Sequence, residues 1–205
     1  MGHKQLEFEN VHWKFRDQHG GVLRNKRRGR KARPLTTKAP VHLVFKIDRR
    51  KIKKGFRSPL GFAICNQVIK RYAKRFFVKI DQLAINGDHI HLIIRISRRS
   101  FGQYFFRVVA GQIAQRMKNE GLWVTDTPSV WKLRPFTRVI RGWKAYNTAR
   151  NYVMLNQKEA EGKIVYRKER LRGLSSAEWE LLSSVEPTLI TNITFSAKTF
   201  GGGRN

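Results

Sequence analysis

Residues 78–96 constrain the fold of this chain more than any other segment. Val78–Ile85 and His89–Ile96 are two runs rich in β-branched and other apolar residues. Between them lies Asn86-Gly87, a dipeptide typical of hairpin turns because both residues tolerate a positive φ. The segment therefore predicts two neighbouring antiparallel strands.

Side chains alternate across a strand, so the second of these strands has two different faces. The apolar face, expected to pack on helices, carries Ile90, Leu92, Ile94 and Ile96. The opposite face carries His89 and His91, about 7 Å apart along the strand. Two neutral imidazoles at this spacing can bind one divalent metal ion if a third ligand comes from above the sheet. His-x-His alone fits two half-exposed polar residues equally well.

The remaining apolar periodicities complete the element order. They predict a strand at Val41–Ile47, helices over residues 59–77, 101–119 and 143–161, and a strand at Val130–Ile140 interrupted near Pro135. The first six elements then follow the order strand, helix, strand, strand, helix, strand. This is the ferredoxin-like βαββαβ order of an α+β domain, with a four-stranded antiparallel sheet and two helices on one face. The extra C-terminal helix is available to cover the other face.

Charge indicates the class of partner. The formal net charge is +29 over 205 residues. Such a charge favours nucleic acid, because each neutralised phosphate releases a counterion. An anionic membrane surface and a ribosomal-type structural role are the alternatives. Residues 171–205 hold three basic and three acidic residues, so the net charge lies in residues 1–170.

The N-terminal region is polar and basic. Seven of the ten residues in Arg24–Arg33 are basic, among them Arg27, Arg28 and Arg30. This segment is either a solvated arm or a phosphate-binding arm, and the two interpretations are compatible because such arms often order on nucleic acid.

One cysteine, no apolar signal core and no run of transmembrane length together predict a cytoplasmic protein without a membrane partner.

The helix over residues 143–161 carries the other candidate groups. Tyr152 and Asn156 are four residues apart and share a helix face, whereas Gln157 lies about 100° further round. Tyr152 could be a core aromatic residue, which is the usual role of a helical tyrosine. An amide oxygen such as that of Asn156 is a reasonable ligand for Mg²⁺ or Mn²⁺.

Two motifs together resemble the HUH single-tyrosine transposases of small bacterial insertion sequences, and most closely their REP-associated relatives. "DHIHLII" matches the family's His-hydrophobic-His pattern at the start of a strand after a turn. "YVMLNQKEAEG" matches the REP-associated pattern at Tyr152, Asn156, Ala160 and Gly162, with Gln157 where proline is usual. The resemblance covers about residues 40–165. It divides the chain into an arm (1–40), a catalytic domain (41–165) and a tail (166–205).

The resemblance implies a metal-dependent endonuclease and strand transferase for single-stranded DNA that contains hairpins. Tyr152 would be the nucleophile that forms a 5′-phosphotyrosine. His89 and His91 would bind Mg²⁺ or Mn²⁺, with Asn156, or alternatively Gln157, as the third ligand. The protein would act on the bacterial nucleoid as a monomer or a homodimer, and a homodimer could exchange the tyrosine helix.

Basic residues around the sheet are expected to hold the DNA backbone. They are Lys46, Arg49, Arg50, Arg95, Arg98 and Arg99, and the arm is expected to add contacts to the hairpin. Trp131, Phe136 and Trp143 could stack on unpaired bases or pack in the core.

Three alternatives remain at this stage. The first is a non-catalytic nucleic-acid-binding protein on a ferredoxin-like sheet, although such proteins place aromatic residues where this chain has histidines. The second is a replication initiator or relaxase, which shares the His-x-His chemistry but is usually longer. The third is a basic ribosome-associated protein, which would leave the pairing of histidines and tyrosine without a role.

Overall fold

Five strands form one antiparallel sheet in the order β1-β5-β2-β4-β3. The computed structural model describes residues 17–21, 32–124 and 129–184. The strands are β1 (Gln18–His19), β2 (Val41–Lys46), β3 (Val78–Ile85), β4 (His89–Ile96) and β5 (Phe136–Val139). Without β1, the chain order β2-α3-β3-β4-α4-β5 is the ferredoxin-like one, so the predicted fold class is confirmed.

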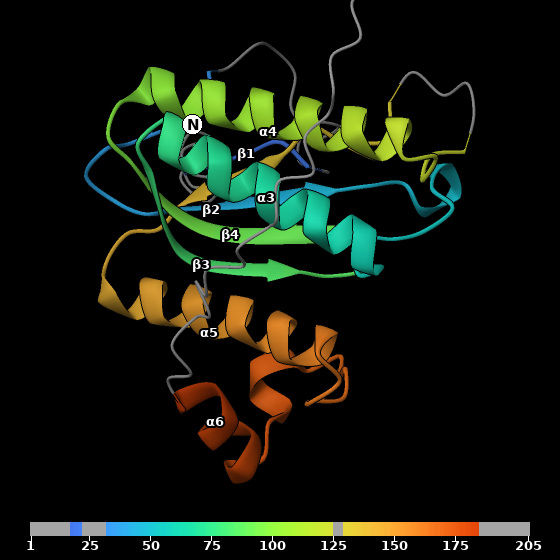
Figure 1. Cartoon of the computed structure of the whole chain (residues 1–205). Coiled ribbons are helices and arrows are strands. Elements are labelled where there is room, and N and C mark those ends of the chain that lie inside the picture. The colour runs from blue at the N-terminus through green and yellow to red at the C-terminus, as the bar shows by residue number, and fades with distance from the viewer. Residues whose placement is uncertain (1–16, 22–31, 125–128, 185–205) are drawn as a thin grey trace, which may run out of the picture.

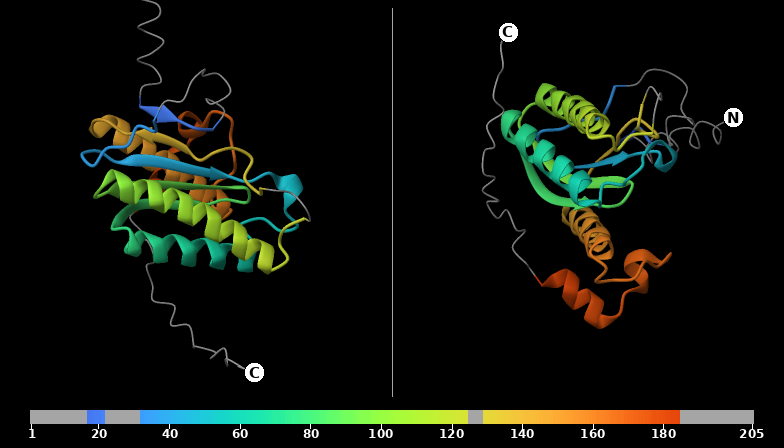
Figure 2. Two further views of the ribbon diagram at one scale, coloured as in Figure 1. Left: turned by 90° about the horizontal axis from the view of Figure 1, so that it is seen from above. Right: turned by 45° about the vertical axis from the view of Figure 1, so that its right-hand side comes forward.

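Helices cover both faces of the sheet (Figures 1 and 2). α3 (Pro59–Arg75) and α4 (Arg99–Asn119) lie side by side on one face. α5 (Trp143–Ala160) crosses the other face, and α6 (Ser176–Ser183) lies beyond it. Two short 3-10 turns, Arg49–Lys51 and Arg170–Gly173, complete the described elements. None of the helices in these described ranges is long and apolar enough to cross a membrane.

The alternation of β4 divides the interior into two cores. Ile90, Leu92, Ile94 and Ile96 belong to the large core under α3 and α4, as the sequence predicts. Ile93 points to the opposite face, where it packs with Ala84, Ile140 and Val153 in a smaller core beneath α5. Because β4 is a central strand packed on both faces, the histidines at its start have little room to move.

Two features of the sheet differ from the sequence prediction. The sheet has a fifth strand, β1, which pairs with β5 and lies in the segment assigned to the arm. The strand predicted at Val130–Ile140 is reduced to β5, and Trp131 makes only an isolated bridge to Ile47. Pro135 lies directly before β5, and proline has no N–H to donate to a ladder, so regular pairing begins after it.

The predicted hairpin forms, and its two strands have the predicted bounds. Residues 86–88 link β3 to β4, and the Asn86 N–H donates to the carbonyl oxygen of His89 at 2.9 Å. The Gly87 carbonyl oxygen lies so near Gly55 that a Cβ on Gly55 would approach it to 2.5 Å. This close approach fixes the turn that leads into His89.

Residues 163–184 fold back onto α5. Met154 and Leu155 of α5 form a small core with Ile164 and Leu182. α6 begins with a capping box, in which Ser175 and Glu178 bond reciprocally to each other's backbone N–H. The short helix α6 therefore supports the helix that carries Tyr152.

Leu182→Ala should loosen this C-terminal support and leave the sheet intact. Leu182 is 2% exposed, so its truncation should weaken the docking of residues 163–184 by about 2 to 5 kcal/mol. Hydrogen exchange of residues 163–184 is the measurement, with protection in β4 expected to persist. The control is Leu181→Ala, since Leu181 is 38% exposed and should cost no more than about 0.5 kcal/mol. Equal exchange in both variants would contradict the packing.

Candidate active site

His91 is hydrogen-bonded to a second histidine that comes from the neighbouring strand. The register of β2 and β4 pairs Val44 with His91, which makes His42 the diagonal neighbour of His91. His42 Nε2 lies 3.1 Å from His91 Nδ1, and the two rings stack with centroids 5.3 Å apart. The sequence-predicted site lacked His42. The alternation of β2 already placed His42 on this face, but its nearness to His91 depends on strand register.

Both of these imidazoles are neutral near neutral pH. Burial, followed by the charge of Arg138, lowers the pKa of His42 to about 4. Burial, followed by the charges of His42, His89, Arg170 and Lys46, lowers the pKa of His91 well below its usual value. The tautomer in which His91 Nδ1–H donates to His42 Nε2 leaves the lone pair of His91 Nε2 free for a metal ion.

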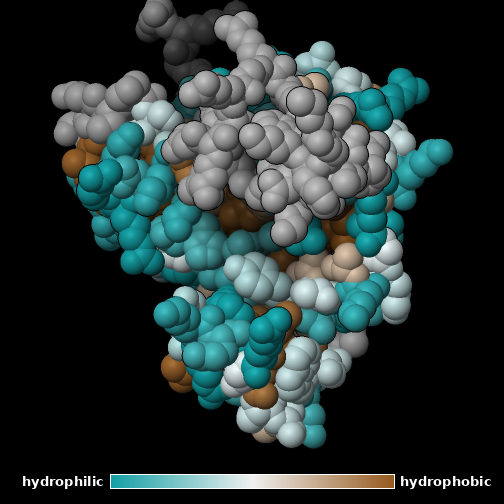
Figure 3. All heavy atoms as spheres, turned by 180° about the vertical axis from the view of Figure 1, so that it is seen from behind, coloured by the Kyte–Doolittle hydropathy of each residue, from teal (hydrophilic) through white to brown (hydrophobic). Residues whose placement is uncertain are grey.

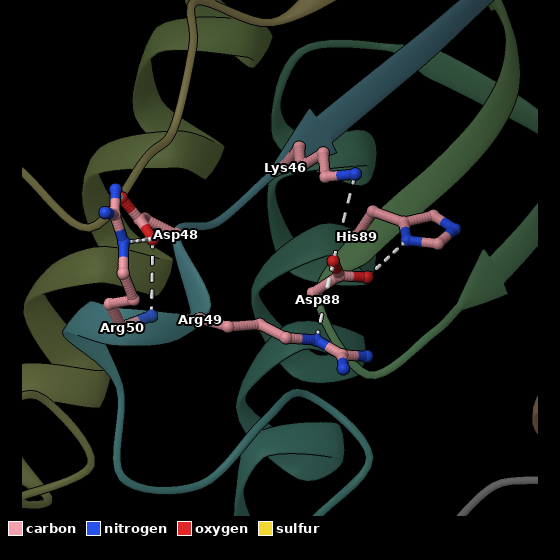
Figure 4. A network of polar contacts seen from close by, with 6 residues as sticks. All are labelled: Lys46, Asp48, Arg49, Arg50, Asp88 and His89. Atoms are coloured by element: carbon pink, nitrogen blue, oxygen red, sulfur yellow. Dashed lines mark hydrogen bonds and ion pairs between the residues drawn. The ribbon is translucent and has the colours of Figure 1, made fainter.

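Asp88 orients His89 at the turn before β4 (Figure 4). His89 Nδ1 lies 2.6 Å from Asp88 Oδ1, while Lys46 and Arg49 approach Oδ2 at 3.9 and 3.5 Å. Burial raises the pKa of Asp88, but the hydrogen bond from His89 and the charges of His89, Lys46 and Arg49 outweigh it, so the net pKa is lowered. A carboxylate on Nδ1 leaves His89 Nε2 as its metal-binding atom.

His89 and His91 face one another closely enough to act together. Their ring centroids lie 4.8 Å apart and their planes are nearly perpendicular. This is closer than the spacing of about 7 Å expected along the strand, because the rings lean together above the sheet. The structure therefore provides two imidazoles on one face, each with Nδ1 engaged.

Tyr152 reaches these histidines from α5. Its ring centroid lies 5.5 Å from that of His91 and 6.3 Å from that of His42, with edge-to-face geometry in both cases. Val153 anchors this turn of α5 in the small core beneath it. Tyr152 is thus held above the sheet beside the histidines of its own chain.

Arg170 contacts the far side of this arrangement and was not identified from the sequence. Its guanidinium carbon lies 5.2 Å from the Tyr152 ring centroid and 5.0 Å from that of Tyr166. Arg170 Nη1 is 2.6 Å from Glu159 Oε1, and both side chains are largely buried. Arg170 has φ 57°, a conformation that is unfavourable for a non-glycine residue and is found at functional sites.

The two amide candidates for a third ligand differ in their surroundings. Asn156 is 3% exposed and lies one turn after Tyr152, to whose carbonyl oxygen its Nδ2 donates at 2.7 Å. Its carboxamide oxygen is the atom that could bind a metal ion. Gln157 instead donates from Nε2 to Glu161 Oε1 at 2.9 Å. This hydrogen bond holds the side chain of Gln157 against Glu161, one turn further along α5.

The predicted metal ligands, His89, His91 and Asn156, are two imidazoles and one amide. No group of three or more His, Cys, Asp or Glu side chains in the described part of the chain is arranged to hold one. The rings of His89 and His91 lie side by side, and Asn156 lies one turn after Tyr152 on α5. Imidazole and amide oxygen are acceptable to Mn²⁺, and the oxygen ligands of a DNA phosphate would suit Mg²⁺ and Mn²⁺.

The sequence-predicted DNA-binding residues fall into separate places. Lys46 and Arg49 contact Asp88, the carboxylate that also bonds His89 (Figure 4). Arg50 instead donates two hydrogen bonds to the carboxylate of Asp48. Arg95 lies further along β4 and bonds Asp81. Arg98 and Arg99 begin α4 beyond the end of β4. Arg27, Arg28 and Arg30 lie outside the described residues.

The three aromatic candidates have different environments. Trp131 packs on Phe45 in the large core, and its Nε1 donates to the Ala110 carbonyl oxygen at 3.2 Å. Phe136 contacts His42 edge-on, with ring centroids 6.4 Å apart. Trp143, at the start of α5, is 74% exposed. Of these three side chains, that of Trp143 is the most exposed.

Comparisons with known proteins give the family and the fold. Residues 36–156, more than half of the chain, match the model of the family described as IS200-like transposases. A solved REP-associated tyrosine transposase bound to a REP hairpin is similar in structure, with a TM-score of 0.51 and 15% identity over 67% of this chain and 76% of that one. A putative transposase from Deinococcus radiodurans gives a TM-score of 0.34 and 13% identity over 68% of this chain and 99% of that one. A comparison with curated proteins finds no match.

Proposed function

The chain belongs to the IS200-like transposase family, and from that premise we propose that it cuts and rejoins single-stranded DNA through a covalent bond to Tyr152. The observation that carries the proposal is the position of the Tyr152 ring, 5.5 Å from that of His91. A tyrosine beside two imidazoles that can bind a metal ion is an arrangement that supports phosphodiester transfer to a phenol.

The reaction exchanges one phosphodiester bond for another. The Tyr152 hydroxyl oxygen attacks the phosphorus and loses its proton, the bond from phosphorus to the 3′ oxygen breaks, and that oxygen takes up a proton. The products are a 5′-phosphotyrosine and a free 3′-OH. Because the covalent bond conserves the phosphodiester energy, a 3′-OH can reverse the step and join strands without a nucleotide cofactor.

His89, His91 and Asn156 would hold Mg²⁺ or Mn²⁺ at this site. The bound ion would orient the scissile phosphate and withdraw charge from it, which helps a phenol of pKa near 10 to attack. Asp88 and His42 fix the rings of His89 and His91 through their Nδ1 atoms. The pairing of Gln157 with Glu161 favours Asn156 as the third ligand.

The proposed site would be complete within one chain. Tyr152 lies beside His42 and His91 of its own sheet, and Met154 and Leu155 fix α5 to the C-terminal segment. These contacts favour a monomer that uses its own tyrosine over a dimer that exchanges the tyrosine helix. Analytical ultracentrifugation of the protein with bound hairpin DNA distinguishes the two.

Basic residues beside the site would hold the DNA backbone. Lys46 and Arg49 flank His89 and remain substantially exposed. Outside the grey atoms, the face seen in Figure 3 is mostly hydrophilic, with small scattered hydrophobic areas. The similar REP-associated structure is bound to a REP hairpin, and we extend hairpin DNA as a class of ligand to this chain.

Covalent capture tests the proposal. The full chain is incubated with Mn²⁺ and labelled single-stranded hairpin DNA from the flanks of its own gene, and the products are separated under denaturing conditions. We expect an adduct with the single-stranded hairpin and none with duplex DNA. Salt-sensitive binding without any adduct would instead support a non-catalytic nucleic-acid-binding protein.

Arg170→Gln should slow adduct formation by up to about a hundredfold, because it removes the guanidinium that packs on the Tyr152 ring. Adduct formation is timed at saturating DNA, so that a change in affinity does not contribute. The change also leaves Glu159 buried and unpaired, which destabilises the fold.

A double variant separates these two effects of Arg170→Gln. Adding Glu159→Gln should restore stability in urea denaturation but should not restore the rate if Arg170 positions Tyr152. Arg172→Gln is the matched control, because Arg172 is exposed in the same turn and should leave the rate unchanged. Full recovery of the rate in the double variant would show that Arg170 has only a structural role.

A further inference from the structure

The start of α5 carries a stacked aromatic pair, with Trp143 exposed and Tyr146 half-buried, that the chemistry at Tyr152 does not use. Trp143 is 74% exposed and stacks on Tyr146, with ring centroids 5.8 Å apart and planes 23° from parallel. A large apolar side chain this exposed has an open π face, since Tyr146 covers only part of it. The pair lines a surface hollow of about 220 Å³.

The pair is held in place rather than loosely attached. Asp81 Oδ2 accepts a hydrogen bond from the Tyr146 hydroxyl at 3.3 Å and another from Arg95 Nε at 2.8 Å. Arg95 also lies over the Tyr146 ring, with its guanidinium carbon 5.6 Å from the centroid. Asp81 is nearly buried while Arg95 remains 47% exposed, so the cation faces solvent beside a fixed aromatic surface.

Cationic side chains lie at and near the hollow. Lys38 and Arg95 line it, and Arg141 stands just before α5. Two acidic groups, Asp81 and Asp17, lie near these cations, and each is neutralised by an arginine, Arg95 and Arg141 respectively. An exposed aromatic surface with cations around it fits the two parts of an unpaired nucleotide, a base with a π face and an anionic phosphate.

The hollow and the candidate active site lie at opposite ends of the same stretches of α5 and β4. Trp143 and Tyr152 are nine residues apart on α5, which corresponds to about 13 Å along the helix axis. Arg95 and His91 are four residues apart on β4, which is also about 13 Å. A single strand bound at the histidines could therefore reach Trp143 within a few nucleotides.

We propose that Trp143 and Tyr146, with Lys38 and Arg95, form a subsite that stacks one unpaired base of single-stranded DNA next to the cleavage site. The inference rests on the proposed function for its substrate class and adds the place where the single-stranded flank is held. Stacking is tolerant of sequence, because every base has a π face, whereas Lys38 and Arg95 contact the backbone.

The test compares a probe that has bases with one that lacks them. The full chain carrying Tyr152→Phe, so that nothing is cleaved, is titrated with labelled oligothymidylate and with an abasic chain of the same length. Trp143→Ala should weaken binding of oligothymidylate by about tenfold or more and leave binding of the abasic chain within about twofold. Trp143→Phe should retain most of the affinity.

Lys38→Ala should weaken binding of both probes, and it should lower the slope of log affinity against log salt concentration by about one unit.

Phe77→Ala is the matched control, because Phe77 is 70% exposed but lies at the end of α3 in the other helix layer. It should change neither affinity. Equal losses for both probes in Trp143→Ala, or no loss for either, would overturn the subsite. Sedimentation without DNA must show the same mass for the protein with and without Trp143→Ala. If the protein were a dimer that Trp143→Ala converts to a monomer, this face would instead be an interface between copies of the chain.

The two proposals can fail separately. If an adduct forms at Tyr152 but binding at Trp143 does not depend on the bases, the subsite proposal is wrong and the proposed cleavage reaction stands. If binding at Trp143 depends on the bases but no adduct forms, the subsite proposal stands and the protein binds single strands without cutting them.

Discussion

Tyr152→Phe should abolish the covalent adduct, with a rate loss of at least about a thousandfold, and should leave DNA affinity nearly unchanged. The substitution removes only the hydroxyl oxygen. The aromatic ring remains to contact His91, His42 and Arg170, so the shape of the site is preserved. A loss of adduct with intact binding would then be chemical rather than structural.

The matched control is Tyr104→Phe. Tyr104 lies on α4, on the opposite face of the sheet, where it is 48% exposed and stacks on Phe76. Loss of its hydroxyl should affect neither adduct formation nor affinity. An adduct that persists in Tyr152→Phe would mean that another side chain is the nucleophile, and the proposed mechanism would be wrong. Peptide mapping of the adduct would then identify that residue.

The sequence predicted those parts of the fold that local periodicity determines. β2, β3, β4, α3 and α5 begin and end within about two residues of their predicted limits, because each has a clear apolar alternation or stripe. β1 has two residues, too few for any pattern, and its pairing with β5 comes from tertiary structure. The interruption near Pro135 is found, but β5 is shorter than predicted because the residues before Pro135 form no ladder beyond the isolated bridge of Trp131 to Ile47.

The candidate site shows the same division between local and long-range information. His89, His91, Tyr152 and Asn156 were identified because each belongs to a short motif. His42 was missed because its contact with His91 depends on the register of β2 against β4. A shift of one residue in that register would move every side chain of the shifted strand to the other face of the sheet. Arg170 was missed because residues 163–184 must fold back before it reaches Tyr152, and no local pattern predicts that return.

His91→Ala should remove metal-dependent adduct formation almost completely, and it tests the second half of the proposed chemistry. His91 is 6% exposed, and burial keeps its pKa low, so it is present as a neutral imidazole, the form that binds metal ions. Its loss leaves His89 and Asn156, which is too few protein ligands to fix a divalent ion beside Tyr152. Adduct yield is measured against Mn²⁺ concentration, and Mn²⁺ binding is measured directly by electron paramagnetic resonance.

His42→Phe provides the graded comparison. Phenylalanine keeps a planar ring stacked on His91 but removes the hydrogen bond to His91 Nδ1, so His91 remains available without a fixed tautomer. The Mn²⁺ concentration needed for half-maximal adduct should rise by about tenfold to a hundredfold, as expected when a group that orients a metal ligand is lost. This order of effects, with His91→Ala more severe than His42→Phe, distinguishes a ligand from a residue that positions it. If neither variant altered Mn²⁺ binding, the three histidines would serve only to pack the sheet against α5, and Tyr152 would need another partner to activate the phosphate.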